Sequence, residues 1–214
     1  MNTDIKLVAL DLDRTTLNSE SHLSEVNRQA LIDAISNGVH VCIASGRAFD
    51  TLPEDIISVP GIEYAITSNG AAIYRIAGKE CLKSYLLTPS SVKTILNLTA
   101  NDTVTYEAFI KGQAFASTEY TAHPEKYGAT EHSLAYVRKT RILKDDIVSF
   151  ILEHCHELDS LDIVVGNEEL KKNIMDRIRN ATDEVYMTSS ISQLLEISYK
   201  DAGKKSGVKF LTEY

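Results

Sequence analysis

The sequence lacks the features that mark membrane, secreted and nucleic-acid-binding proteins. No apolar run approaches the roughly 20 residues that a membrane helix needs. The N-terminus also lacks the basic and then apolar layout of a secretory signal. Lysine and arginine are scattered and the formal net charge is −8, whereas phosphate-backbone contacts need clustered basic side chains. We therefore expect a cytoplasmic protein with neither a membrane nor a nucleic-acid partner.

Cysteine is scarce. Cys42, Cys81 and Cys155 are odd in number, far apart and without a C-x-x-C pair, which predicts reduced core thiols. His154 and His156 flank the last cysteine, but that segment has a helical pattern. Because residues i and i+2 of a helix project about 200° apart, we do not expect a metal site there.

The length and composition are those of an ordinary globular chain. The 214 residues are 43% hydrophobic and 24% charged, enough to bury a sizeable core. The chain has room for one large domain or for a core domain with a smaller second domain.

Two carboxylates come directly after the first apolar run. Residues 7–10 lead into Asp11 and Asp13, which would project the same way from a strand or from a tight bend leaving it. The carboxyl ends of the strands in an open α/β sheet are where ligands bind. Such a pair can hold a divalent cation, and one carboxylate can act as nucleophile while the other transfers protons. The pattern alone is weak, because acidic turns after strands are common.

The first part of the chain has strand–helix–strand order. Ser24 is a predicted N-cap, and a further helical pattern starts near Phe49. The predicted elements are strands at 7–10, 39–44 and 64–67, a helix at 25–37, and a hairpin at 72–76 and 81–87. Because such crossovers join parallel strands, Ser45 is expected beside Asp11.

The composition changes near Thr88, where we predict a second module. Thr88 and Pro89 suit a helix start. The predicted elements are helices at 88–99, 145–157 and 167–179, and strands at 104–109, 114–118, 161–165, 185–188 and 194–199. The apolar side of the second helix is expected to hold Ile147, Val148, Ile151 and Leu152. Residues 119–140 have poor periodicity and remain unassigned.

The fold class predicted from these elements is α/β, with a Rossmann-like, doubly wound parallel sheet as core and an inserted α+β cap. We assign residues 1–87 and 189–214 to the core and residues 88–188 to the cap. The chain's return is marked by a glycine-bearing basic turn at 200–207 that leads into a helix. A helix start joined by a lysine makes an anion site, although a plain surface turn fits the same residues.

Four short motifs, taken in order, resemble the haloacid dehalogenase superfamily. They are Asp11-Leu12-Asp13-Arg14-Thr15, Ser45-Gly46-Arg47, Ser68-Asn69-Gly70-Ala71 and Lys204. More narrowly, the chain is similar to the Cof-type sugar-phosphate phosphatases, which carry a large α+β cap of the C2 type between the second and third motifs. The resemblance covers essentially the whole chain, and four motifs in order are far more specific than any one of them.

The resemblance implies a phosphomonoester hydrolase that needs Mg²⁺ and acts on a small sugar or metabolite phosphate. Asp11 matches the nucleophile that becomes an aspartyl-phosphate, and Asp13 matches the general acid and base. Both are also the expected Mg²⁺ ligands.

The resemblance also assigns the surrounding residues. The implied phosphate-binding residues are Thr15, Ser45, Gly46 and Lys204, and the implied substrate-pocket residues are Arg47, Asn69 and Gly70. Lys205 is the alternative to Lys204, because the family usually has glycine directly after its lysine. Arg47 either reaches the substrate or braces the loop.

Two departures from the family pattern matter. Arg14 stands where the family commonly has glycine, which would modify substrate approach. The fourth motif, an acidic G-D-x-x-x-D stretch, does not occur before Tyr214, so we expect a truncated chain with weak Mg²⁺ binding and low or no turnover. The alternatives are a non-catalytic member that binds a phosphate ligand, and a phosphotransferase or phosphomutase. The substrate and the oligomeric state stay open.

Overall fold

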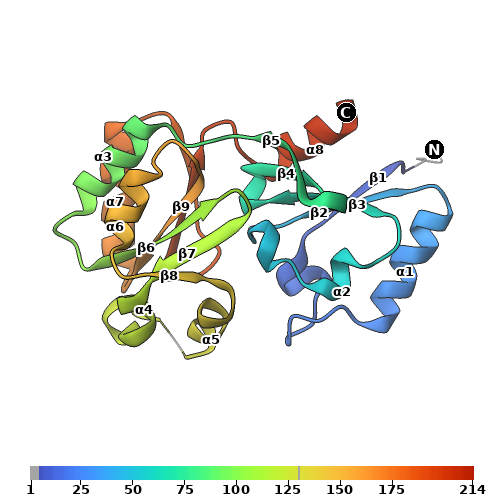
Figure 1. Ribbon diagram of the computed structural model, residues 1–214, viewed down its shortest axis with the longest axis horizontal. Coiled ribbons are helices and arrows are strands. Elements are labelled where there is room, and N and C mark those ends of the chain that lie inside the picture. The colour runs from blue at the N-terminus through green and yellow to red at the C-terminus, as the bar shows by residue number, and fades with distance from the viewer. Residues whose placement is uncertain (1–4, 130) are drawn as a thin grey trace. The chain divides into compact units, whose positions relative to one another are not determined.

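The computed structural model describes residues 5–129 and 131–214, which belong to two compact units (Figure 1). The core unit comprises Met1–Ser84 and Gly203–Tyr214, and the cap unit comprises Tyr85–Ala202. Residues 1–4 and 130, which the sequence assigned to the core and the cap, lie outside the described part. No helix in that part combines the length and the apolar character needed to cross a bilayer.

The core unit contains one five-stranded sheet with the order β1-β2-β3-β4-β5. Its strands are β1 (Leu7–Leu10), β2 (His40–Ala44), β3 (Ile62–Thr67), β4 (Ala72–Arg75) and β5 (Glu80–Ser84). Its helices are α1 (Glu25–Ser36), α2 (Glu54–Ile57) and α8 (Lys204–Glu213), with short helical turns at Leu12–Thr16, Phe49–Thr51, Ser68–Gly70 and Ala77–Lys79. The first three strands are parallel, and the β4–β5 hairpin is antiparallel.

Helices cover both faces of this sheet, because successive side chains of a strand point to opposite faces. Leu31 of α1 belongs to a buried cluster with Ile43 and Ala65. Gly207 of α8 lies against Ile66, the next residue of β3, so closely that a Cβ would come within 2.6 Å of it. The predicted Rossmann-like core is therefore confirmed.

Local sequence signals account for the start of α1 but not for the length of the next helix. Ser24 caps α1 by accepting a hydrogen bond from the Asn27 backbone N–H. The helix expected from Phe49 is only a short turn followed by α2, which spans four residues. Pro53 separates these two pieces and cannot donate the hydrogen bond that a continuous helix would require.

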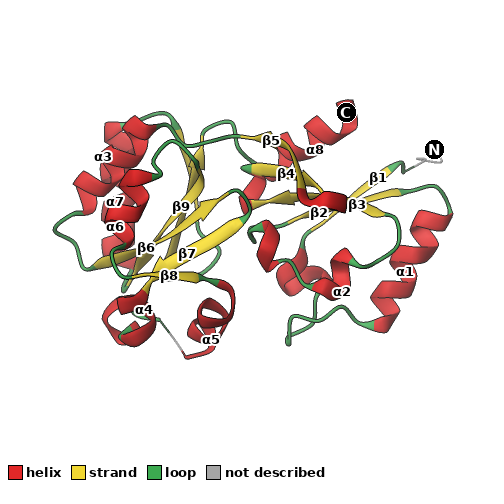
Figure 2. Ribbon diagram, in the orientation of Figure 1, coloured by secondary structure: helices red, strands yellow, loops and turns green. Residues whose placement is uncertain are grey.

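The cap unit contains a six-stranded sheet with the order β10-β11-β9-β6-β7-β8. Its strands are β6 (Val104–Ile110), β7 (Gln113–Ser117), β8 (Ile142–Lys144), β9 (Leu158–Val165), β10 (Val185–Thr188) and β11 (Leu194–Tyr199). Its helices are α3 (Pro89–Thr99), α4 (Thr118–Ala122), α5 (Glu131–Thr140), α6 (Ile147–Glu153) and α7 (Glu168–Ala181), with a short turn at Pro124–Tyr127. Figure 2 shows this mixture of helices and strands. Among the described strands of this sheet, only the β7–β8 pair is parallel.

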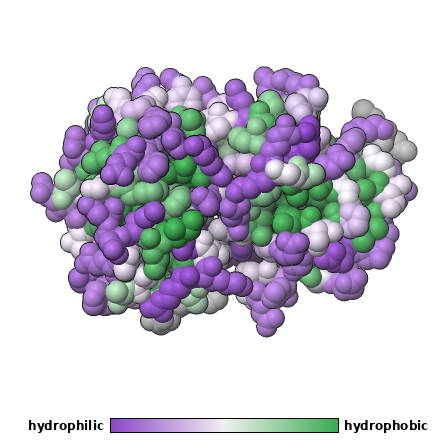
Figure 3. Space-filling model, in the orientation of Figure 1, coloured by the Kyte–Doolittle hydropathy of each residue, from purple (hydrophilic) through white to green (hydrophobic). Residues whose placement is uncertain are grey.

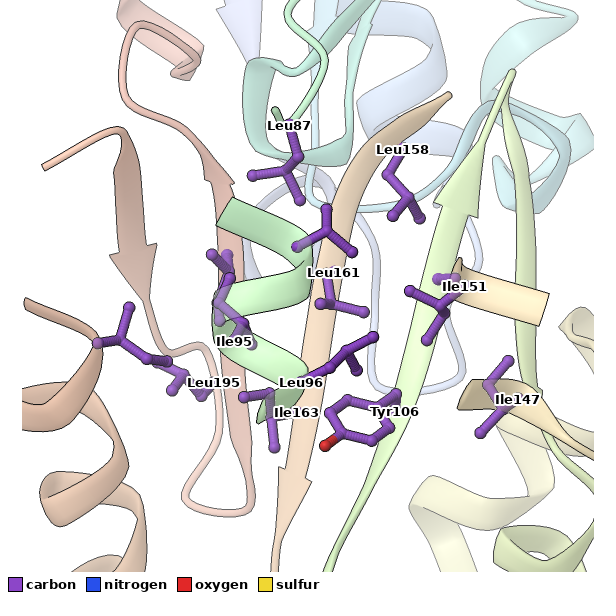
Figure 4. Packing of buried hydrophobic residues seen from close by; sticks show 14 of the residues in the cluster. Leu87, Ile95, Leu96, Tyr106, Ile147, Ile151, Leu158, Leu161, Ile163 and Leu195 are labelled. Atoms are coloured by element: carbon purple, nitrogen blue, oxygen red, sulfur yellow. The ribbon is translucent and has the colours of Figure 1, made fainter. Parts of the chain in front are cut away.

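The cap core lies between this sheet and helices α3, α6 and α7. Figure 4 shows the packing, in which alternate residues of β9 point toward the helices. Its fully buried members include Ile95, Ile151, Leu158, Leu161, Ile163 and Leu195. Thr88 caps α3 through its side chain and Pro89 occupies the first turn, as the sequence predicted.

Several predicted boundaries in the cap are wrong. Strand β11, assigned to the core by the boundary at residue 189, pairs with β9 and β10 instead, so the cap unit extends to Ala202. Helix α6 ends at Glu153, so the helical spacing argument does not apply to the following histidines. Val148 and Leu152 are exposed rather than buried, and Figure 3 shows hydrophobic residues at the surface.

The unassigned segment 119–140 contains α4, a short turn and α5. The expected core position is correct for Cys42 but wrong for Cys81, which is exposed, and Cys155 is half-buried. Burial raises the pKa of the Cys42 thiol to about 11, so this thiol stays protonated at neutral pH.

Candidate active site

The tight turn after β1 presents two carboxylates. Thr16 donates a hydrogen bond from Oγ1 to the Asp11 carbonyl at 2.6 Å, and Thr15 donates from Oγ1 to Asp11 Oδ2 at 3.3 Å. Leu12 is fully buried between them, whereas the Asp11 and Asp13 side chains are 45% and 52% exposed. The alternation predicted from the sequence therefore places both carboxylates outside the core.

Lys204, rather than Lys205, contacts the first carboxylate. Its Nζ lies 2.5 Å from Asp11 Oδ1, although 193 residues separate the two in sequence. Lys204 is the first residue of α8, and Lys205 is exposed. Because consecutive helix residues project about 100° apart, only one of two adjacent lysines can face the site.

Close backbone packing fixes where α8 begins. Gly70 has φ +98°, and a Cβ there would lie 2.1 Å from the Gly203 carbonyl carbon. Only glycine at position 70 permits this contact, and Asn69 before it is also left-handed, with φ 55°. Gly70, which was expected in the substrate pocket, thus helps to hold the N-terminus of α8, and with it Lys204, at the strand ends.

Arg47 binds the second carboxylate through two hydrogen bonds. Its Nε and Nη2 donate to the two oxygens of Asp13 at 2.9 and 2.7 Å. Its Nη1 donates to the Thr51 carbonyl at 3.1 Å, and the side chain is only 10% exposed. Of the two roles expected for Arg47, this geometry supports bracing of the Asp13 loop.

The turns after β2 and β3 are joined by hydrogen bonds. Ser45 is buried, and its hydroxyl accepts the Arg47 backbone N–H at 3.2 Å. The Asn69 backbone N–H donates to the Ser45 carbonyl at 3.1 Å. A Cβ on Gly46 would lie 3.0 Å from Asn69 Oδ1, so this glycine permits close packing of the two turns.

The strand register brings these turns to the same edge as Asp11. Leu10 pairs with Ile43 in parallel strands, so Asp11 and Ser45 follow neighbouring strand ends. The contacts join Asp11 with Lys204 and Asp13 with Arg47, while the Ser45 hydroxyl bonds within its own turn.

Sequence reasoning missed three supporting residues. Thr16 holds the Asp11 carbonyl, Thr51 accepts from Arg47, and Gly203 packs on Gly70. A second threonine directly after the D-x-D-x-T pattern was a usable signal for the first of these. The role of Thr51 had none, because the contact depends on the path of a loop.

The carboxylates do not by themselves form a magnesium site. Mg²⁺ demands octahedral oxygen coordination, whereas this edge offers Asp11 and Asp13, each already bound to a cationic side chain. Among the side chains that the structure describes, in residues 5–129 and 134–214, no group of three or more His, Cys, Asp or Glu could hold a metal ion.

A separate cavity of about 480 Å³ lies at the opposite ends of the core strands. Its lining includes Lys6, His40, Glu63 and Tyr214, which are at or near the amino ends of the strands and the end of α8. This cavity contains none of the residues of the candidate site.

Comparisons with known proteins identify the family of the chain. A sequence profile of the haloacid dehalogenase-like hydrolase family matches residues 8–214. The 5-amino-6-(5-phospho-D-ribitylamino)uracil phosphatase YcsE of Bacillus subtilis is 41% identical over 73 residues. The matched stretch is 34% of this chain and 29% of that relative's length.

Solved structures share the fold over almost the whole chain. A haloacid dehalogenase-like hydrolase from B. subtilis has a TM-score of 0.76 at 22% identity, over 98% of this chain and 78% of its own. The sugar phosphatase BT4131 of subclass IIB has a TM-score of 0.76 at 15% identity, over 97% and 75%. The profile match and the shared fold show that this chain belongs to the haloacid dehalogenase-like hydrolase family.

Proposed function

We propose that the chain is a phosphomonoester hydrolase for a small sugar or metabolite phosphate, and that Asp11 and Asp13 carry the chemistry. The observation that supports this most is that two exposed carboxylates share the strand edge with a lysine and an arginine. The family relationship agrees with hydrolysis of phosphate esters. The named phosphatase among the relatives supports a small phosphorylated metabolite as substrate.

In the first step, a carboxylate oxygen of Asp11 attacks phosphorus. A bond forms between this oxygen and phosphorus, and the bond from phosphorus to the ester oxygen breaks. Asp13 takes up a proton from solvent as substrate binds and Arg47 releases one of its oxygens, and it donates that proton to the departing alcohol. The ammonium group of Lys204 offsets the charge that builds up as one anion approaches another.

In the second step, water cleaves the aspartyl-phosphate. Asp13 accepts a proton from this water as its oxygen attacks phosphorus, which returns the proton given to the alcohol. The bond between phosphorus and the Asp11 oxygen breaks, and inorganic phosphate leaves. Thr15, Ser45 and Gly46 are the proposed phosphate-binding residues beside Lys204.

The test is turnover of an aryl phosphate by the wild-type chain and by Asp11→Asn, which keeps the shape of the side chain and removes the nucleophile. We expect the variant to lose at least about a thousandfold in kcat. Asp176→Asn, an exposed change in α7, is the control and should retain wild-type turnover. Activity that survives Asp11→Asn would overturn the mechanism.

The same assay separates the alternatives. Phosphate release without any added acceptor indicates hydrolysis, whereas release that requires a second alcohol indicates a phosphotransferase. Phosphate binding measured by calorimetry, without turnover at any Mg²⁺ concentration, indicates a non-catalytic member.

The Mg²⁺ requirement, the aspartyl-phosphate and the cytoplasmic location stay predictions. Weak Mg²⁺ binding is expected, because the ion must compete with Lys204 for Asp11 and with Arg47 for Asp13. Calorimetric titration with MgCl₂ measures this affinity directly.

A further inference from the structure

Arg14 is an additional cation in the candidate site. The charges of Asp11 and Lys204 offset each other, and so do those of Asp13 and Arg47. Arg14 is exposed, and among the described residues none forms a hydrogen bond or ion pair with it. The site therefore carries one net positive charge before a ligand arrives, in a chain whose formal charge is −8.

The backbone at Arg14 is left-handed. Its φ is 61° and its ψ is 12°, in a turn that is closed by a hydrogen bond from Leu17 N to the Leu12 carbonyl at 2.9 Å. This conformation is unfavourable for a residue with a Cβ, and glycine would adopt it without strain. Strained residues that the surrounding structure holds in place cluster at functional sites. An unpaired guanidinium on such a residue indicates a binding site for an anionic ligand.

The position of Arg14 in the turn indicates which part of a substrate it would meet. Lys204 lies on the Asp11 carboxylate, where the transferred phosphate must be. Asp13 serves the ester oxygen on the leaving-group side, and Arg14 directly follows Asp13. Since the guanidinium is exposed, it is available to the organic part of the ester rather than to the phosphate.

We propose that Arg14 is a specificity-determining residue that binds a second anionic group, a carboxylate or another phosphate, on the leaving-group side of the substrate. This proposal rests on the proposed function and names its substrate class as phosphate esters with two anionic groups. A guanidinium suits this role because its planar donors match carboxylate and phosphate oxygens in pairs.

The test compares two esters that differ in one group, 3-phosphoglycerate with a carboxylate and glycerol 3-phosphate with a hydroxymethyl group. We expect wild type to prefer the carboxylate in kcat/KM. Arg14→Ala should lower the ratio of the two kcat/KM values about tenfold or more, as expected for loss of a charge-assisted hydrogen bond. Arg14→Lys should retain part of the preference. A ratio unchanged by Arg14→Ala would overturn the proposal.

The matched control is Lys111→Ala. Lys111 is also basic, exposed and left-handed, with φ 50°, but it lies in the hairpin turn between β6 and β7. This variant should leave the ratio at the wild-type value. An equal fall in both variants would assign the effect to overall charge and overturn the proposal.

A binding measurement keeps the two proposals distinguishable. In the Asp11→Asn background neither ester reacts, so calorimetry gives the affinity for each. If wild type hydrolyses neither ester, the proposed function fails, while tighter binding of 3-phosphoglycerate that Arg14→Ala removes would still support the role of Arg14. Equal affinities for the two esters would overturn it.

Discussion

The core and the cap both contain an arginine–carboxylate ion pair, but the two pairs differ in burial. In the core, Arg47 binds Asp13, whose side chain is 52% exposed. In the cap, Arg141 binds Glu107 at 2.7 Å, and both side chains are at least nine-tenths buried, at 8% and 4% exposure. Two aromatic rings also lie near the cap pair, with the guanidinium 5.3 Å from the Phe109 ring and 5.1 Å from the Tyr136 ring.

The difference in burial means that the exposed Arg47–Asp13 pair can exchange partners, whereas the buried Arg141–Glu107 pair cannot. Water and a ligand reach Asp13, so the interaction with Arg47 is screened and can be remade around a substrate. Burial lowers the pKa of Arg141, but the charges of Glu107 and Tyr136 and the hydrogen bonds to both together raise it by more, so Arg141 stays charged inside the cap. The cap pair should therefore determine stability, and the core pair should determine activity.

The largest expected effect is on stability, from Arg141→Met. Removing one partner leaves the buried Glu107 carboxylate without its counter-charge, which costs about 3–5 kcal/mol in the free energy of unfolding. Urea denaturation followed by circular dichroism measures this loss.

The double variant Glu107→Met with Arg141→Met should recover most of the loss, because no unpaired charge remains. Lys111→Met, which breaks the exposed pair with Glu157, is the control and should cost less than about 1 kcal/mol. An equal cost for the buried and the exposed pair would contradict the comparison.

Arg47→Ala should reduce activity much more than stability, the reverse of the effect expected for Arg141→Met. We expect kcat to fall about 10- to 100-fold, the range for loss of a positioning contact, because Asp13 loses both hydrogen bonds that orient it. The free energy of unfolding should fall by only about 1 kcal/mol, since the partner carboxylate is exposed. Steady-state kinetics and urea denaturation of the same preparation measure both quantities.

Arg47→Lys distinguishes positioning from simple charge. A lysine restores the charge but offers no planar pair of donors, so kcat should recover only in part while KM stays close to that of Arg47→Ala. A loss confined to KM would show instead that Arg47 binds substrate directly.

The sequence predicted most of the core, because each of its signals is local. Ser24 as N-cap, the apolar run of β1 and the parallel order of the first three strands all depend on neighbouring residues or on short crossovers. The sheet membership of β11 depends on pairing with β9, about 30 residues earlier in the chain, and no local pattern encodes it. Segment 119–140 could not be assigned from its sequence, because the residues of its helices α4 and α5 are mainly polar and show no clear apolar periodicity.

The candidate site likewise has features that the sequence predicted and features that it did not. The residue types of the motifs were sufficient to select Asp11, Asp13 and Lys204, two of which the structure joins in one ion pair. The partner of Arg47 remained open, because a long side chain can reach any of several loops. The left-handed backbone of Arg14 had one signal, the glycine that the family commonly has at this position, but the arginine itself gives none.

Asp162 adds a second buried carboxylate to the cap pair. In β9, Asp162 pairs across the sheet with Glu107 of β6 on one side and Glu196 of β11 on the other. Burial raises the pKa of the Asp162 carboxyl well above its usual value, and the charges of Glu196 and Glu107 raise it further, against the opposing effect of Arg141. The folded chain therefore retains a proton on Asp162 at a pH at which the unfolded chain has lost it.

The last expected effect is the pH dependence that this proton creates. Because the folded pKa lies above the unfolded value, the contribution of Asp162 to stability is complete below about pH 4 and is lost as pH rises toward the folded pKa. Asp162→Asn has no such proton, so its free energy of unfolding should gain on wild type by up to about 1.4 kcal/mol per pH unit above pH 4. Urea denaturation from pH 4.5 to 8 measures the difference, with exposed Asp176→Asn as control, whose curve should run parallel to wild type. If the difference in free energy of unfolding between Asp162→Asn and wild type did not change with pH, the Asp162 carboxyl would be ionised in the folded chain. Burial in the cap would then not prevent a carboxylate from keeping its charge, and the contrast with the exposed carboxylates of the core would fail.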